Sequence, residues 1–232
     1  MHIALTLFAI GFAPGIFWLW YFYSRDKIEP EPRALVAKIF FYGVLITVPV
    51  AIVEGIVSGV AVSLLTPAIG AFLLAVVVAP IVEEYGKFYV VRNSVYQSKE
   101  FSEPMDGILY GAAAALGFAA LENAWYILYA FLSSPIEAVT TFTFRALISV
   151  PAHPLISSIW GFSLGQAKFG LSSNPQGAIL RGLFLAMLLH GVFNLLAGMQ
   201  LFIGLIALVL FLVPLLWFLV SRNIRVALEE SP

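Results

Sequence analysis

One apolar stretch of the sequence contains two glutamates and a lysine at spacings that suit proton transfer. In the string PIVEEYGK, Glu83 and Lys87 are four residues apart, and Glu84 and Lys87 are three apart. On a helix, both spacings allow the side chains to pair. Adjacent Glu83 and Glu84 point about 100° apart, so one carboxylate can act in catalysis while Lys87 or another helix holds the other. The alternative interpretation is a buried ion pair that fixes the helix register, next to a kink at Pro80.

Two histidines and an asparagine supply further polar groups. His190 and Asn194 are four residues apart in the string HGVFN and therefore share a helix face. Such a pair can bind an oxyanion, bind a metal or hydrogen-bond a neighbouring helix. His153 has Pro151 and Pro154 around it, which predicts irregular backbone there. Irregular backbone at membrane depth is tolerated only inside the protein or around a wet cavity, which favours a functional histidine.

Activation of water is the chemistry that fits this set. A glutamate paired with a histidine can take a proton from water and deliver it to a leaving amine. A second histidine with an asparagine can donate hydrogen bonds to a tetrahedral oxyanion. We therefore expect a hydrolase without a cofactor. A zinc ion held by Glu83, His153 and His190 is the competing version, because two histidines and a glutamate form a known catalytic zinc set; the sequence has no HExxH string to support it.

More ionisable and polar residues interrupt the apolar stretches. An ionisable side chain in a membrane span costs about a few kcal/mol and usually faces the bundle interior. At about 1.5 Å per helical residue, the catalytic candidates Glu83, His153 and His190 all fall near the middle of the membrane. We expect supporting roles near this site for four residues: Lys87, Glu122, Asn123 and Arg145. Glu54 is a further acidic residue within a span.

A serine hydrolase is a weaker alternative. The string GFSLG matches the GxSxG pattern around Ser163, but that pattern acts in a strand–turn–helix context, and here it lies in an apolar helical stretch. Gly161 and Gly165, four residues apart, favour a helix-packing face instead. The chain has no cysteine, which excludes disulfides, thiolate metal sites and cysteine nucleophiles.

Composition places these residues in a membrane. The chain of 232 residues is 61% hydrophobic and 11% charged, whereas soluble domains average about 25% charged residues. The net charge of −1 gives no indication of a nucleic-acid partner. We predict an all-α, polytopic bundle that forms a single domain over residues 1–232. Seven stretches approach the roughly 20 apolar residues that cross the hydrocarbon core: 2–23, 34–57, 69–91, 106–132, 139–167, 178–199 and 201–220.

Basic residues predict the orientation. Apart from Lys87 and Arg145, all lysines and arginines lie in or near loops on one side of a seven-span bundle, so the N-terminus faces out and the C-terminus is cytoplasmic. The first stretch lacks a preceding positive region, so we expect a span and not a signal peptide. Residues 60–65 either extend the second helix or lie at the membrane–water interface. The charged, proline-rich loop 24–33 predicts a stiff, solvated connector.

The sequence resembles the PrsW family of intramembrane proteases, within the group that includes CAAX prenyl endopeptidases and bacteriocin-processing proteins. The resemblance is carried by APG at 13–15, YFYSRD at 21–26, EPEPR at 29–33, PIVEEYGK, residues 107–123, residues 145–153 and HGVFN. It implies cleavage of a membrane-anchored protein, such as an anti-sigma factor, in the cell membrane of a bacterium or archaeon. It implies Glu83 and Glu84 as the essential pair, with His153 and His190 as further site residues.

Two functions of other classes remain open. An ion- or proton-coupled transporter could use the same polar cluster, although a relay would scatter its ionisable groups across the membrane depth. A scaffold or peptide-binding protein would bind its ligand without turnover.

Overall fold

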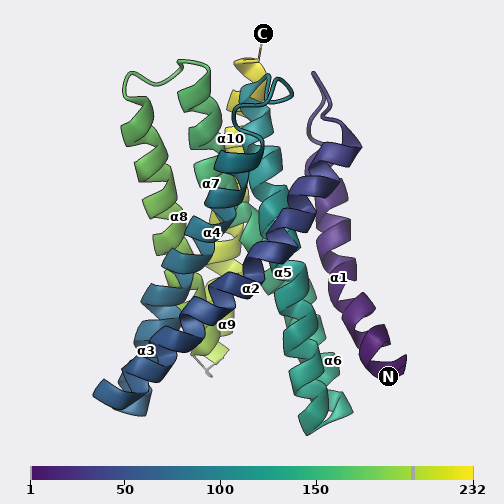
Figure 1. Cartoon of the computed structure of the whole chain (residues 1–232), viewed down its shortest axis with the longest axis vertical. Coiled ribbons are helices and arrows are strands. Elements are labelled where there is room, and N and C mark those ends of the chain that lie inside the picture. The colour runs from purple at the N-terminus through teal and green to yellow at the C-terminus, as the bar shows by residue number, and fades with distance from the viewer. Residues whose placement is uncertain (1, 200–201, 232) are drawn as a thin grey trace.

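The computed structural model describes residues 2–199 and 202–231, and its regular elements there are all helices. Seven helical stretches in this part of the chain are long and apolar enough to cross a membrane, which confirms the all-α polytopic bundle. The two termini lie at opposite ends of the bundle (Figure 1), as an odd number of spans requires. Which end faces the cytoplasm stays a prediction from the basic residues.

The spans match the predicted stretches, and most of them are longer by a few residues. Those made of one helix are α1 (His2–Tyr23), α2 (Arg33–Leu64), α5 (Pro104–Ser133) and α8 (Pro175–Gly198). The third joins α3 (Pro67–Leu73), η1 (Leu74–Val78) and α4 (Ala79–Ser94); the fifth joins α6 (Pro135–Phe144), η2 (Arg145–Ser149) and α7 (Val150–Lys168); the seventh joins α9 (Phe202–Ala207), η3 (Leu208–Leu212) and α10 (Val213–Glu229). Residues 60–64 thus extend the second helix, and the predicted start at 201 lies outside the described residues.

Each of the three spans made of several helices contains a five-residue π-helical segment. The segment ends two residues before a proline. The prolines are Pro80, Pro151 and Pro214. Proline has no N–H to donate, and in each case the residue before it bonds one position further back than in an α-helix: Ala79 to Leu74, Val150 to Arg145 and Val213 to Leu208. The prediction of irregular backbone at His153 is therefore wrong by one turn, because the irregularity precedes Pro151 and His153 lies in regular α7.

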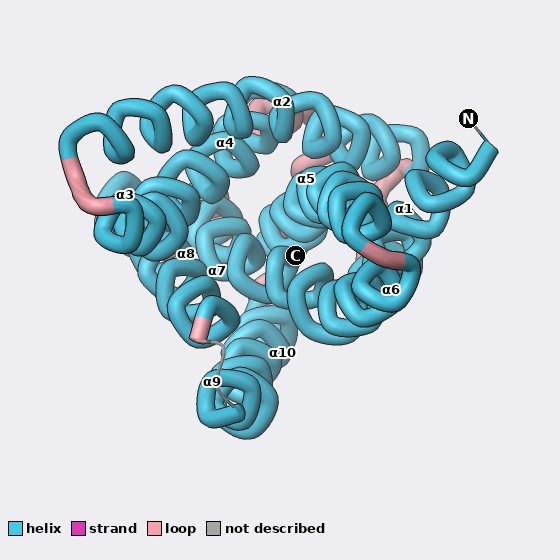
Figure 2. Tube along the Cα trace, turned by 90° about the horizontal axis from the view of Figure 1, so that it is seen from below, coloured by secondary structure: helices cyan, strands magenta, loops and turns pink. Residues whose placement is uncertain are grey.

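Helix α5 forms the centre of the bundle. In an 18-residue apolar stretch of α5, 94% of the residues are buried, against 17% in α1. Helices α1, α2 and α7 pack around α5 (Figure 2). Small residues allow this close packing: a Cβ on Gly117 would collide with the backbone carbonyl of Phe40 in α2. The polar residues of α5 are thereby held among its neighbours.

The GxSxG string is a packing face, as the glycine spacing favours. A Cβ on Gly161 would meet the backbone of Gly107, and one on Gly165 would meet that of Pro104, so both glycines let α7 lie against α5. The Ser163 hydroxyl donates to the carbonyl of Ile159 in its own helix, at 3.1 Å. Among the described residues, no histidine, lysine or carboxylate hydrogen-bonds to the Ser163 hydroxyl.

Part of the first loop is buried, which contradicts the prediction of a solvated connector. Asp26 and Glu31 are almost fully shielded from solvent, and the Asp26 carboxylate accepts the backbone N–H of Glu31 at 3.0 Å. This bond folds the loop back on itself. The sequence pattern missed the burial because charge and proline content do not show which side chains turn inward.

Candidate active site

Lys87 lies at the centre of a group of five buried side chains, which we name the central cluster: Glu83, Glu84, Lys87, His153 and His190. Its Nζ donates to Glu83 Oε2 at 3.0 Å and to Glu84 Oε1 at 2.8 Å, so both predicted pairings are confirmed. The same Nζ lies 3.0 Å from His153 Nδ1. These three contacts occupy all three protons of the ammonium group.

Each of the two carboxylate oxygens of Glu84 accepts two hydrogen bonds. Ser157 Oγ and Trp160 Nε1 donate to its Oε2, at 2.6 and 3.0 Å. Its Oε1 contacts Lys87 and, at 3.0 Å, His190 Nδ1. The side chain is fully buried. A carboxylate held in this way is an anchor for three helices and has no free lone pair directed at a substrate.

Glu83 is held much more loosely. Its Oε2 accepts from Lys87, and His190 Nε2 and His153 Nδ1 lie 3.8 and 4.0 Å away. Its Oε1 makes no hydrogen bond with the described residues. Glu83 also lines a cavity of about 770 Å³. Of the two adjacent glutamates, Glu83 is therefore the one that can meet water and a substrate.

Each histidine has a carboxylate behind it. His190 Nδ1 contacts Glu84, and His153 Nε2 lies 3.2 Å from Glu122 Oε2. In the neutral tautomers that satisfy these contacts, His153 Nδ1 accepts from Lys87 and His190 Nε2 carries a lone pair on the side of Glu83. The two rings lie 5.3 Å apart, edge to face.

Apart from Lys87, the predicted supporting residues form a second polar chain next to the central cluster. Arg145 Nη2 donates to Glu122 Oε2 at 2.7 Å, and Arg145 Nε donates to Asn123 Oδ1 at 3.2 Å. Asn123 Nδ2 donates in turn to the carbonyl of Gly11 in α1, at 2.7 Å. Because His153 contacts Glu122, this chain orients the histidine and pairs the Glu122 charge.

Asn194 does not join the central cluster. Its Nδ2 donates to the carbonyl of Ala75 at 2.9 Å. That carbonyl is available because Ala79, its usual α-helical donor, bonds to Leu74 in the π-helical segment. Asn194 thus hydrogen-bonds the sixth span to the third, which is one of the roles that its spacing allowed. The predicted oxyanion role has no support in this geometry.

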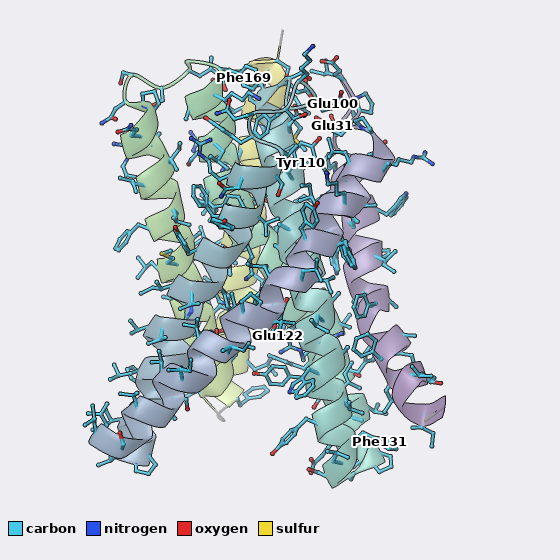
Figure 3. All side chains as sticks on the ribbon, in the orientation of Figure 1. Glu31, Glu100, Tyr110, Glu122, Phe131 and Phe169 are labelled. Carbon is cyan, nitrogen blue, oxygen red and sulfur yellow. The ribbon has the colours of Figure 1, made fainter. Side chains whose placement is uncertain are left out.

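The cavity beside Glu83 is mainly apolar. It lies between α2 and α5, and Figure 3 shows Glu122 between these helices, about midway along the bundle. Its lining consists of Phe8, Thr47, Val48, Ala51, Ile52, Glu54, Glu83, Phe118, Leu121, Glu122, Trp125, Tyr126 and Tyr129. Aromatic and aliphatic walls around a few carboxylates suit an apolar peptide segment.

The same residues fit a zinc ion in donor type. Glu83, His153 and His190 each offer one ligand atom, and these atoms lie within 4.8 Å of one another. A carboxylate behind each histidine is the usual outer shell of a zinc site. Against this, the Lys87 ammonium already contacts two of the three donors, and a bound ion requires it to move away.

Sequence reasoning identified the central cluster and its depth but missed three residues. Ser157 and Trp160 follow His153 by four and seven positions, so all three share one face of α7. That spacing was available as a signal, although serine and tryptophan carry no charge to draw attention to it. Phe118 was also missed; its ring lies 4.4 Å from Lys87 Nζ, a favourable cation–π distance.

Comparison with known proteins points to one family. A family model described as "PrsW family intramembrane metalloprotease" matches residues 31–219. Protease PrsW of Geobacillus kaustophilus (strain HTA426) is 38% identical over 82% of this chain and 78% of its own length. Protease PrsW of Bacillus subtilis (strain 168) is 34% identical, over 82% and 81%, and that of Oceanobacillus iheyensis is 32% identical, over 98% of each. No solved structure matches the chain.

Proposed function

Because the chain belongs to the PrsW family of intramembrane proteases, we propose that it cleaves membrane-anchored proteins with Glu83 as the base that activates water. Its bacterial relatives and seven spans make it a multi-pass protein of the plasma membrane. One observation carries the proposal: Glu83 faces the cavity, whereas Glu84 beside it is saturated with donors.

Lys87 prepares Glu83 for this role. A carboxylate in a water-poor site is stable as an anion only with a positive partner, and Lys87 supplies one at 3.0 Å. Glu83 then takes a proton from a water in the cavity while the water oxygen attacks the peptide carbonyl carbon. When the C–N bond breaks, Glu83 gives that proton to the leaving amine, so it acts first as base and then as acid.

His190 replaces the predicted histidine–asparagine pair as the oxyanion donor. Its Nε2 is the imidazole nitrogen on the Glu83 side, and Glu84 contacts Nδ1 at 3.0 Å. In the doubly protonated form of His190, Nδ1–H donates to Glu84 and Nε2–H donates to the developing oxyanion. Lys87 is not assigned this role, because its three protons already have acceptors.

A zinc-dependent version is the second candidate. Glu83, His153 and His190 would hold the ion, which would polarise the peptide carbonyl and lower the pKa of a bound water. The carboxylates behind both histidines favour this version, and the position of Lys87 favours the metal-free version. We keep the metal-free version as the primary proposal.

The substrate belongs to the proposal as well. The resemblance to PrsW proteins points to an anti-sigma factor, and the apolar, aromatic cavity lining supports a substrate that enters from the membrane. A transporter that uses the same groups is disfavoured, because the ionisable residues facing Glu83 meet at one depth instead of forming a path.

Cleavage of a single-span reporter by the purified protein in liposomes tests the role of Glu83. We expect Glu83→Gln to lower the rate about 10²–10⁴-fold while the melting temperature stays near that of the wild type. Full cleavage by the Glu83→Gln variant would overturn the proposal.

Chelation separates the two versions of the mechanism. If the reaction is metal-free, dialysis against a zinc chelator leaves the cleavage rate unchanged, and added zinc does not raise it. Loss of cleavage that zinc alone restores would select the zinc-dependent version, with Glu83, His153 and His190 as ligands.

A further inference from the structure

Four acidic side chains are buried at the end of the bundle that carries the C-terminus. Two come from the loop between α1 and α2, and two from the start of α5; we name this group the end cluster: Asp26, Glu31, Glu103 and Asp106. Their exposed fractions are 4%, 3%, 1% and 0%. Figure 3 shows Glu31 at this end, near Tyr110 of α5.

No basic side chain among the described residues contacts the end cluster. Within residues 2–199 and 202–231, no lysine or arginine forms an ion pair with any of its four members. Lys168 acts on Asp106 and Glu31 only through space. Its Nζ donates instead to the carbonyls of Tyr96 and Ser98, at 2.7 and 3.2 Å. Buried carboxylates are normally paired or coordinate a metal.

Backbone amides orient two of the carboxylates. Asp26 Oδ2 accepts the N–H of Glu31 at 3.0 Å. Asp106 Oδ2 accepts the N–H groups of Ser102 and Glu103, at 2.6 and 2.8 Å. The second oxygen of each aspartate, Oδ1, is buried without a hydrogen-bond partner. Each aspartate is therefore fixed through one oxygen and leaves the other free to bind a ligand.

The two glutamates provide an independent indication of a ligand. Both carboxylate oxygens of Glu31, and both of Glu103, are buried without a hydrogen-bond partner. The carboxyl group of Asp106 and the hydroxyl of Tyr110 lie next to Glu31. When they are ionised, carboxylates this close to one another require a positive group between them.

We propose that the end cluster binds a hard divalent cation, Ca²⁺ or Mg²⁺. All free ligand atoms are oxygens, which these ions prefer. One oxygen each from Asp26, Glu103 and Asp106 lie within 4.8 Å of one another. Oxygens on opposite sides of Ca²⁺ are about 5 Å apart, and those around Mg²⁺ about 4 Å. Oxygens this close together can coordinate either ion after small side-chain adjustments.

A cation here would join two parts of the fold. Asp26 and Glu31 belong to the first loop, whereas Glu103 and Asp106 lie at the start of α5, the central helix that also carries Glu122. The bound ion would thus fix the first loop to the helix that positions part of the active site. This inference does not depend on the proposed protease chemistry.

Thermal unfolding of the full-length protein in detergent tests the site. We expect millimolar Ca²⁺, and to a smaller extent Mg²⁺, to raise the melting temperature of EDTA-treated protein by about 5–10 °C at saturation. The test variant is Glu103→Gln, because the amide keeps the size of the side chain and removes its charge. The control is Glu100→Gln, which removes a nearby but exposed charge.

The variants distinguish binding from a general salt effect. Glu103→Gln should melt at or above the wild-type temperature in EDTA and lose most of the rise with Ca²⁺. Asp26→Asn should behave in the same way, whereas Glu100→Gln should keep the full rise. The proposal is overturned if neither ion stabilises the wild type, or if Glu103→Gln and Asp26→Asn respond like Glu100→Gln.

Discussion

The two buried groups of acidic side chains, one midway along the bundle and one at its end, differ in how their charge is balanced. In the middle, Lys87 contacts Glu83 and Glu84, while Arg145 contacts Glu122. Two histidines complete the hydrogen bonds. The end cluster contains four carboxylates and no ion pair among the described residues.

The difference follows from what each place can obtain from its surroundings. The lipid around the middle of the bundle offers no cation, so the charged carboxylates of the central cluster are balanced by partners from the protein itself. The end of the bundle borders the aqueous phase, where divalent cations and protons are available. At that end, cations or protons from the solution can therefore balance part of the carboxylate charge.

Removal of Lys87 should have the largest effect. Lys87→Met keeps the side-chain length but leaves Glu83 and Glu84 without their shared cation. Loss of one partner of a buried pair costs about 3–5 kcal/mol, so we expect a large fall in melting temperature and no reporter cleavage. Lys38→Met, at an exposed position in α2, is the control. A Lys87→Met variant as stable as this control would show that the central charges are balanced in another way.

Loss of one donor to Glu84 should have the next largest effect. Ser157→Ala removes the 2.6 Å bond to Glu84, and a hydrogen bond to a charged group contributes about 1.5–3 kcal/mol. Ser158→Ala is a close control, because the Ser158 hydroxyl is also buried but has no hydrogen-bond partner. Chemical unfolding of both variants should show a loss for Ser157→Ala only. Equal stability of the two would contradict the role of Glu84 as an anchor.

The end cluster should make stability depend on pH in the absence of divalent cations. Burial raises the pKa of Glu31 and of Glu103 to about 7, and it also raises the pKa of Asp26. The folded state then holds protons that the unfolded state releases near pH 4.5. The associated stability is fully present below pH 4.5 and is lost as the pH rises through 7.

Melting curves in EDTA from pH 5 to pH 8 test whether stability falls as the pH rises. The melting temperature should fall by a few degrees over that range. The charged groups around Glu31 and Glu103 are Asp26, Glu29, Glu100, Asp106 and the more distant Lys168. Added Ca²⁺ should restore stability at pH 8 and have little effect at pH 5. A melting temperature that rises with pH in EDTA would refute the prediction.

The smallest effect is expected at Asn194. Asn194→Ala removes one neutral hydrogen bond to Ala75, which contributes about 1 kcal/mol. Reporter cleavage per folded molecule should stay near the wild-type rate, because Asn194 lies outside the central cluster. Asn93→Ala, which removes a bond within α4, is the control. A rate loss of about 100-fold or more at Asn194 would restore the oxyanion role that its spacing predicted.

The sequence by itself determined the spans, the pairing of Lys87 with both glutamates and the common depth of Glu83, His153 and His190. These properties depend on distances along single helices, and the geometry of a helix is regular. The order of the motifs also sufficed to indicate the family. Span ends moved by a few residues, since capping and fraying depend on local contacts.

Only the tertiary structure decided which glutamate faces the cavity, where Asn194 donates and which acidic residues of the first loop are buried. A sequence gives the angle between two side chains on one helix, but not the rotation of that helix against its neighbours. The rotation of α4 points Glu84 at Ser157 and Trp160 and leaves Glu83 toward the cavity. Such long-range packing arises from all helices together, so no single motif contains it.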